Sequence, residues 1–265
     1  MEENMISDLR LIEMFSTLKR PIVFLDFDGT ISKKDVIDQI LERFADDEWL
    51  EIEEMWLDGK IGSRVCLQKQ FALVKATPDE LDGFIDSLEL DEGFLNVVRF
   101  CERANIKVHI ISDGFDYYIR RMLSKAFGDV EYIAEIEIYA NSLKPISKNS
   151  WETDFPYFET VCGDGCATCK PAVMRLKNPL NQSPIFVGDG LSDRFAAQSA
   201  DVVFAKKKLA EFCDQNRIPH IKYFNLEQVA ESLSDAFEPV LVPIFQIADR
   251  TEQAGIYMEI NESFI

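Results

Sequence analysis

Residues 22–30, with the sequence IVFLDFDGT, decide the fold class of this chain. The apolar run Ile22 to Leu25 predicts a buried strand, and two carboxylates, Asp26 and Asp28, follow it directly. Open α/β sheets present their chemistry at the carboxyl ends of their strands. Carboxylates at positions i and i+2 lie on one side of an extended backbone, where their repulsion raises a pKa or requires a cation. The stretch therefore indicates an acid beside a nucleophile or a metal ligand.

Apolar runs at four later places predict further strands: 106–111, 185–187, 202–204 and 221–224. Helical patterns separate them, which predicts an α/β fold with a doubly wound, mostly parallel sheet. Residues 132–147 have the pattern of short strands and turns.

The domain organisation follows from one long helical pattern between the first two strands. It is too long for a simple crossover, so we interpret it as an inserted helical cap. The apolar tail could pack on the core or on another subunit, so a homodimer is one expectation. The expected parts are a core at 1–34 and 104–238, a cap at 35–103 and a tail at 239–265.

Charge limits the classes of partner. The chain has 28 Lys plus Arg and 47 Asp plus Glu, so its formal charge is 28 − 47 = −19. Such a surface repels nucleic acid and anionic lipid, so we expect neither a nucleic acid nor a membrane as partner. The first residues lack the features of a signal peptide, and no apolar run approaches the ~20 residues that span a bilayer. A cytoplasmic location is therefore expected.

Polar residues follow three of the predicted strands, and a lysine stands between the second and the third. Together and in this order they resemble the four signature motifs of the haloacid dehalogenase-like phosphatases. The resemblance implies a Rossmann-like core with a cap and a phosphoryl-transfer site. The matching positions are Asp26 with Asp28 and Thr30, then Ser112 with Gly114, then Lys170, and then Asp189 with Asp193.

The chemistry also follows from the residue types. Asp26 and Asp189 need a divalent cation to share, and hard oxygen ligands favour Mg²⁺. Asp26, kept ionised, could attack phosphorus and form an aspartyl-phosphate. Asp28 would be protonated near the leaving oxygen and would then deprotonate the attacking water. The expected substrate is a small phosphorylated metabolite.

The resemblance implies further roles at the matching positions. Ser112 and Lys170 would hold the phosphoryl oxygens, with help from amides around Gly114 at a helix N-terminus. The backbone carbonyl of Asp28 would join the metal ligands. Asp193 would support the metal shell or orient Lys170, and Thr30 would position Asp28.

The expected cap resembles the helical cap of phosphoserine phosphatases, which excludes water and selects the leaving group. Asp35, Ser63, Arg64 and Gln68 are the candidates to face the substrate. Arg64 follows a glycine-containing break, so it could start a helix and point toward the site. A surface cation is an equally good interpretation of Arg64.

A cysteine-rich segment runs into Lys170, with Cys162, Cys166 and Cys169 spaced as Cys-x₃-Cys-x₂-Cys. The spacing would suit an iron–sulfur cluster, but its position beside the phosphatase lysine argues against one. Zinc would need a fourth ligand such as Asp164 or Cys213. Reduced structural thiols are the favoured interpretation.

This loop and the cap segment GKIGSR at 59–64 resemble the methionine-salvage branch, which dephosphorylates 2-hydroxy-3-keto-5-methylthiopentenyl 1-phosphate. Phosphoserine phosphatases and phosphocholine or phosphoethanolamine phosphatases are the alternatives. A phosphomutase or phosphotransferase would share Asp26 but use another acceptor than water. A non-catalytic binding protein would have lost motif carboxylates, and none is lost here. We therefore expect a Mg²⁺-dependent phosphatase.

Overall fold

The computed structural model describes residues 20–128, 130–159 and 165–237. The lead-in at 1–19 and the tail expected at 239–265 lie outside the described residues. None of the helices that the structure describes is both long and apolar enough to cross a bilayer.

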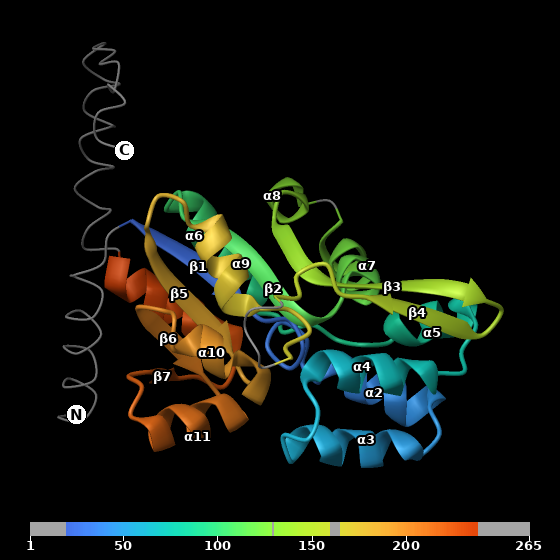
Figure 1. Cartoon of the computed structure of the whole chain (residues 1–265). Helices are drawn as coiled ribbons and strands as arrows, with labels where there is room; N and C mark the ends of the chain where they lie inside the picture. The colour runs from blue at the N-terminus through green and yellow to red at the C-terminus, as the bar shows by residue number, and fades with distance from the viewer. Residues whose placement is uncertain (1–19, 129, 160–164, 238–265) are drawn as a thin grey trace, which may run out of the picture.

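A twisted sheet forms the centre of the molecule, with the strand order β4-β3-β2-β1-β5-β6-β7 (Figure 1). Neighbouring strands are parallel except for the antiparallel pair β3 and β4. The mostly parallel α/β sheet expected from the sequence is therefore confirmed. The strands are β1 (Pro21–Leu25), β2 (Lys107–Phe115), β3 (Glu137–Ser147), β4 (Ser150–Asp154), β5 (Ser183–Gly188), β6 (Val202–Ala205) and β7 (Ile221–Lys222).

Helices cover the sheet and fill the segment between β1 and β2. The stretch expected as short strands and turns instead forms a four-residue helix and one eleven-residue strand, β3. The helices are α2 (Val36–Phe44), α3 (Glu48–Leu57), α4 (Ser63–Ala72), α5 (Pro78–Ile85), α6 (Phe94–Arg103), α7 (Asp116–Phe127), α8 (Glu131–Ala134), α9 (Lys170–Lys177), α10 (Arg194–Ala197) and α11 (Lys207–Asn216).

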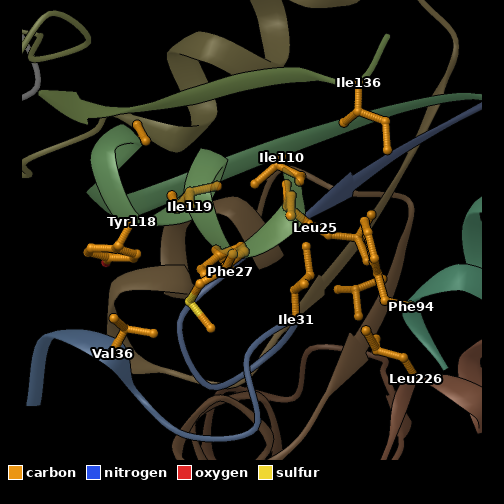
Figure 2. Packing of buried hydrophobic residues seen from close by; sticks show 14 of the residues in the cluster. Leu25, Phe27, Ile31, Val36, Phe94, Ile110, Tyr118, Ile119, Ile136 and Leu226 are labelled. Atoms are coloured by element: carbon orange, nitrogen blue, oxygen red, sulfur yellow. The ribbon is translucent and has the colours of Figure 1, made fainter. Parts of the chain in front are cut away.

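Strand β1 is buried on both faces because it lies between β2 and β5. Val23 and Leu25 belong to one hydrophobic cluster, and Ile22 and Phe24 belong to the cluster on the opposite face. This alternation is the two-residue period of a strand, and all four side chains are fully buried. Figure 2 shows Leu25 packed among side chains from β2, α6 and α7. A strand without a polar face explains why the carboxylates begin only where β1 ends.

The chain leaves and re-enters the core at one crossing. Ser32 and Leu90 form an isolated antiparallel bridge, and Asp91 N donates to Ile31 O at 2.7 Å. Helices α2 to α5 lie beyond this crossing, whereas α6 contacts β2 and packs on the core (Figure 1). The expectation put the end of the cap at residue 103. Because α6 packs on the sheet, we propose an end near Leu90.

The hairpin of β3 and β4 extends alongside the helices of the proposed cap and contacts α4 (Figure 1). Trp151 of β4 donates from Nε1 to Ala76 O at 2.9 Å, just before α5. Arg121 of α7 pairs with Asp82 of α5 at 2.9 Å and with Asp86, the residue that follows α5, at 2.7 Å. The cap helices are thus held by contacts to both the sheet extension and a core helix.

Candidate active site

The carboxyl ends of β1, β2 and β5 meet at one edge of the sheet, because these three strands are adjacent and parallel. Asp26 follows β1, Ser112 lies near the end of β2, and Asp189 follows β5. Asp26 N continues the ladder by donating to Val187 O at 2.9 Å. The structure therefore brings together the polar residues that the sequence places at separate strand ends: Ser112 Oγ donates to Asp28, and Asp26 and Asp189 have carboxylate oxygens within 4.8 Å of each other.

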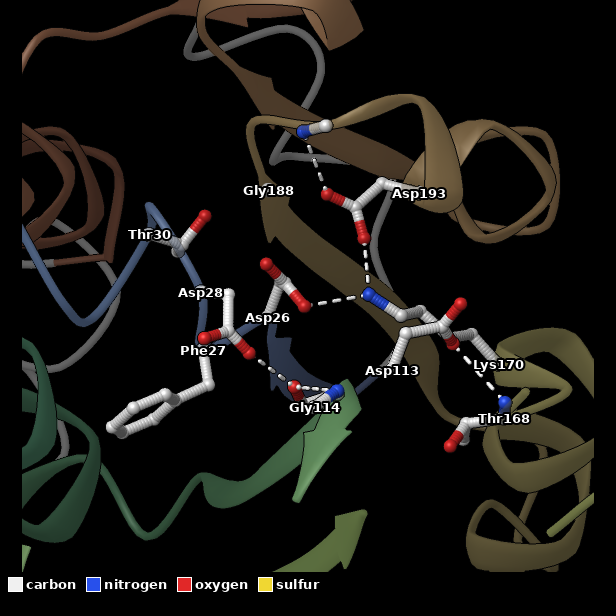
Figure 3. Close-up of polar contacts among 12 residues, drawn as sticks. Asp26, Phe27, Asp28, Thr30, Asp113, Gly114, Thr168, Lys170, Gly188 and Asp193 are labelled. Carbon is white, nitrogen blue, oxygen red and sulfur yellow. Dashed lines mark hydrogen bonds and ion pairs between the residues drawn. The ribbon is translucent and has the colours of Figure 1, made fainter. Parts of the chain in front are cut away.

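Lys170 is the buried cation of this site. Its Nζ lies 2.6 Å from Asp26 Oδ1 and 2.5 Å from Asp193 Oδ1, and its side chain is 1% exposed (Figure 3). Burial alone lowers the pKa of Lys170, but the charges of Asp193 and Asp26 outweigh it and raise that pKa. Lys170 is therefore charged, and it is the first residue of α9.

Asp193 holds Lys170 in place and is itself fully buried. Its second oxygen, Oδ2, accepts from the backbone amides of Asp189 at 3.0 Å and Gly190 at 3.1 Å. Both oxygens of Asp193 are thus occupied by donors from the end of β5 and from Lys170. Of the two roles expected for Asp193, the contacts match the orientation of Lys170.

Asp28 has a different set of partners from Asp26. Its Oδ2 accepts from Ser112 Oγ at 3.0 Å and from Tyr118 Oη at 2.8 Å, and its Oδ1 accepts from Val36 N at 3.2 Å. Burial raises the pKa of Asp28 to about 6, although these three hydrogen bonds lower it. Asp28 is therefore a carboxyl group that can gain or lose a proton near neutral pH.

The sequence analysis missed Tyr118, which lies buried in the first turns of α7. A clue exists in Gly114, because a Cβ there would collide with Tyr118 Oη and Asp28 Oδ2. Gly114 also donates its amide to Ser112 Oγ at 2.8 Å. A glycine is thus needed at this position of β2 so that a tyrosine can reach the carboxyl group.

Asp189 contacts two other donors. Thr30, which was expected to position Asp28, donates instead from Oγ1 to Asp189 Oδ1 at 3.4 Å. Lys207, which the sequence analysis did not select, lies with Nζ 2.9 Å from Asp189 Oδ2. Gly29 has φ +72°, and a Cβ there would collide with the carboxylate of Asp189. The turn after β1 therefore packs directly against this carboxylate.

The carboxylates of Asp26, Asp189 and Asp193 form a compact buried group, with one oxygen of each within 4.8 Å of the others. Burial, followed by the charges of Asp193, raises the pKa of Asp26, and the charge of Lys170 lowers it. One buried ammonium does not balance this group together with Asp28, so the donor set fits a divalent cation. Asp26 and Asp189 are the members that fit as ligands, because Asp193 is held by the buried Lys170 ammonium and by two backbone amides, whereas the cation beside Asp189 is the half-exposed Lys207.

The described part of the cysteine-rich loop makes a backbone contact with the end of β2. Among the described residues, the His, Cys, Asp and Glu side chains that could hold a metal together are those of the three aspartates. Cys213 of α11 packs in a hydrophobic cluster. Thr168 N donates to Asp113 Oδ1 at 3.1 Å (Figure 3). Cys162 and Asp164 lie outside the described residues. The contact of Thr168 joins the end of the loop to β2, next to Lys170.

A cavity of about 330 Å³ lies over the carboxylates, between them and helices α2 to α4. Of the four residues expected from the cap, Asp35 and Ser63 line this cavity. Arg64 and Gln68 are not among its described lining residues. The Arg64 guanidinium lies 3.9 Å from the centroid of the Phe158 ring, and Gln68 is exposed.

The cap side of the cavity contains residues that the sequence analysis did not select. They are two further carboxylates, an indole and a buried amide, which come from α2, α3 and α4. Their positions in the sequence do not distinguish them from solvent-facing residues, because carboxylates and amides are equally common on the exposed face of a helix. The residues are Asp38, Glu53, Trp56 and Gln70.

Comparison with protein families identifies one match, to the haloacid dehalogenase-like hydrolases, over residues 23–198. A curated 2-hydroxy-3-keto-5-methylthiopentenyl-1-phosphate phosphatase from Bacillus pumilus is 32% identical over 210 residues, which are 78% of this chain and 87% of the relative. The enzyme of the same name from Brevibacillus brevis is 28% identical, over 84% of this chain and 99% of the relative.

Solved structures give the same fold. A phospho-aspartyl intermediate analogue of phosphoserine phosphatase has a TM-score of 0.61 at 19% identity, over 81% of this chain and 99% of that one. A substrate-bound phosphoserine phosphatase complex has a TM-score of 0.61 at 20% identity, over 80% and 98%. At this level of identity the likeness shows the architecture alone.

The buried ion cluster predicts a pH-dependent loss of stability in Lys170→Met. Removing one partner of a buried ion pair costs about 3–5 kcal/mol, so we expect a loss of that size at pH 7. Burial already raises the folded-state pKa of Asp26 above its unfolded value, and loss of the ammonium, whose charge lowers that pKa, raises it further. Protonation of Asp26 then favours the folded state, so the loss should shrink as the pH falls from 7 to 5. Urea denaturation followed by circular dichroism measures it.

Lys69→Met, at an exposed position on α4, is the control for removal of a lysine from the surface. A loss in Lys170→Met no larger than in this control, or equal at both pH values, would contradict the role given to Lys170.

Proposed function

Because the chain belongs to the haloacid dehalogenase-like hydrolases, we propose that it is a phosphomonoesterase which transfers a phosphoryl group to Asp26 and then to water. The observation that carries this proposal is the pairing of two aspartates with different environments at the base of one cavity. Asp26 lies 2.6 Å from a buried ammonium, whereas Asp28 accepts from hydroxyl and amide groups and has a pKa of about 6. Such a division of environments suits a nucleophile beside a general acid.

Asp26 is the proposed nucleophile. Lys170 holds its Oδ1, so the carboxylate has a fixed orientation, and Asp26 lines the cavity that the substrate would enter. An in-line attack by an Asp26 oxygen forms a bond to phosphorus while the bond to the leaving oxygen breaks. The product of this first step is an aspartyl-phosphate and an alcohol. Positioning by Lys170 lowers the entropic cost of the attack.

Asp28 is the proposed acid and base. Its proton would pass to the leaving oxygen in the first step, and the resulting carboxylate would take a proton from water in the second. The attack of that water on phosphorus regenerates Asp26 and releases phosphate. Two hydroxyl donors on Oδ2 fix the orientation of the carboxyl group during both steps.

Mg²⁺ is the proposed cofactor, held by Asp26 and Asp189, with the backbone carbonyl of Asp28 as a third ligand by resemblance to the family. When bound, it would offset the repulsion between these carboxylates and the phosphoryl group. Lys170 would supply the second positive charge for the phosphoryl oxygens. Ser112 Oγ and the amides near Gly114 would supply neutral donors.

The substrate we propose is 2-hydroxy-3-keto-5-methylthiopentenyl 1-phosphate, the compound in the names of the relatives that align over most of this chain. The charge of the cap supports it over phosphoserine. The described cap residues that line the cavity include three carboxylates and no lysine or arginine: Asp35, Asp38 and Glu53. A leaving group with its own carboxylate would be repelled there, whereas the apolar end of a methylthiopentenyl group could pack against Trp56 and Leu67.

Asp26→Asn tests the nucleophile. An amide is a poor nucleophile, so Mg²⁺-dependent hydrolysis of 4-nitrophenyl phosphate should fall by about 10³-fold or more. Asp201→Asn, an exposed change of the same type, is the control and should retain activity. Equal activity of the Asp26 variant and the wild type, or no activity in either, would contradict the assignment of Asp26 as the nucleophile.

Tyr118→Phe tests the acid. The hydrogen bond from Tyr118 lowers the pKa of Asp28, so its loss raises that pKa. Protonated Asp28 then persists to higher pH, and the falling alkaline limb of kcat/KM should move upward by as much as about 1 pH unit. Tyr117→Phe is the matched control, because Tyr117 Oη donates to Asp82 at 2.7 Å instead. A limb that stays in place, or moves downward, would contradict the assignment.

A panel of phosphorylated metabolites tests the leaving group. We expect kcat/KM for the methylthiopentenyl phosphate to exceed that for phosphoserine by about tenfold or more, a difference that one unfavourable charge contact can produce. Asp38→Asn, which removes a cap carboxylate, should lower the ratio of kcat/KM for the methylthiopentenyl phosphate to kcat/KM for phosphoserine. Phosphoethanolamine and phosphocholine belong in the panel because their cationic groups suit an acidic wall. Turnover of phosphoserine equal to the leading substrate would refute the assignment.

A further inference from the structure

Asp189, a nearly buried carboxylate, forms an ion pair with Lys207, a half-exposed lysine. Lys207 Nζ lies 2.9 Å from Asp189 Oδ2, and the Lys207 side chain is 54% exposed while that of Asp189 is 10% exposed. Lys207 also lines the cavity over the carboxylates. A surface lysine thus reaches inward to one of the carboxylates that fit a divalent cation.

The backbone of Lys207 adopts a conformation that side chains rarely take. Its φ is +48°, in the left-handed region that favours glycine. The flanking chain is anchored to the end of β5, because Lys206 N donates to Gly188 O at 3.3 Å and Leu209 N donates to Asp189 O at 2.9 Å. These two hydrogen bonds, one on each side of Lys207, keep the start of α11 against Asp189. The lysine therefore stays beside this carboxylate at the cost of a strained backbone.

The neighbouring lysines differ from Lys207. Lys206 Nζ lies 4.9 Å from the centroid of the Tyr223 ring, and Lys208 lines the same cavity. The ion pair with Asp189 Oδ2 belongs to Lys207. Since Thr30 donates to the other oxygen, Oδ1, both oxygens of Asp189 already have partners.

We propose that Lys207 is an internal competitor for the divalent cation, so that its ammonium and the metal occupy Asp189 in turn. This inference rests on the proposed function, in which Asp189 is a metal ligand. A metal bound there would repel an ammonium at hydrogen-bonding distance from the same carboxylate. The half-exposed side chain of Lys207 has room to leave, because it borders the cavity and a second, more open hollow on the surface.

The displaced ammonium would still border the cavity that receives the phosphoryl group. A phosphoryl dianion bound in that cavity would then be a partner for the ammonium, which would link metal binding to substrate binding. The competition gives the site a low affinity for the metal alone. The chain thus contains its own device for tuning metal affinity.

Isothermal titration of Mg²⁺ into the full-length chain tests this inference, with Lys207→Met compared with Lys208→Met. Both changes remove one positive charge from the cavity, but Lys207→Met also removes the partner of Asp189. We expect Lys207→Met to bind Mg²⁺ about fivefold more tightly than the wild type, and Lys208→Met to stay within about twofold. Lys207→Arg, which keeps the cation, should resemble the wild type.

Thermal unfolding without and with saturating Mg²⁺ provides a second measurement. Lys207→Met should have a lower Tm than the wild type without the metal and a larger rise when the metal is added. Equal Mg²⁺ affinity of Lys207→Met and Lys208→Met, or weaker binding by Lys207→Met, would overturn the inference. Absence of Mg²⁺ binding in the wild type and all variants would overturn the proposed metal site together with it.

Discussion

A buried ammonium surrounded by carboxylates is the constraint on which the site depends. Lys170 needs Asp26 and Asp193 as partners, because an unpaired charge at 1% exposure would be strongly destabilising. The three residues come from the end of β1, the start of α9 and the segment after β5. Their mutual attraction therefore fixes three distant parts of the chain at one edge of the sheet. The same attraction leaves one oxygen of Asp26 available to react.

The position of β1 follows from the same arrangement. A strand with fully buried side chains on both faces belongs in the middle of a parallel sheet, and β1 lies between β2 and β5. Polar residues can therefore occur only after the strand ends, where they lie beside the polar residues at the ends of β2 and β5. The burial of β1 on both faces thus explains both its central position in the sheet and the placement of Asp26 and Asp28 directly after it.

Much of this could be predicted from the sequence, because strand ends with carboxylates obey local rules. The predicted strands that end before Asp26 and Asp189 exist, and the carboxylates that follow them lie together. The contacts of Tyr118 and Lys207 could not be predicted, since each depends on how a helix is placed against the sheet. The same holds for α6, whose helical pattern is equally compatible with a cap or with a core layer. Its burial against β2 comes from the tertiary fold.

The central claim is that Asp26 carries the phosphoryl group between substrate and water. The direct measurement is acid quenching during turnover, followed by borohydride reduction and peptide mass spectrometry. An acyl phosphate on Asp26 is reduced to an alcohol, so we predict homoserine at position 26 in the presence of substrate and Mg²⁺ only. Homoserine at another aspartate, or aspartate recovered unchanged under conditions of full turnover, would contradict the account.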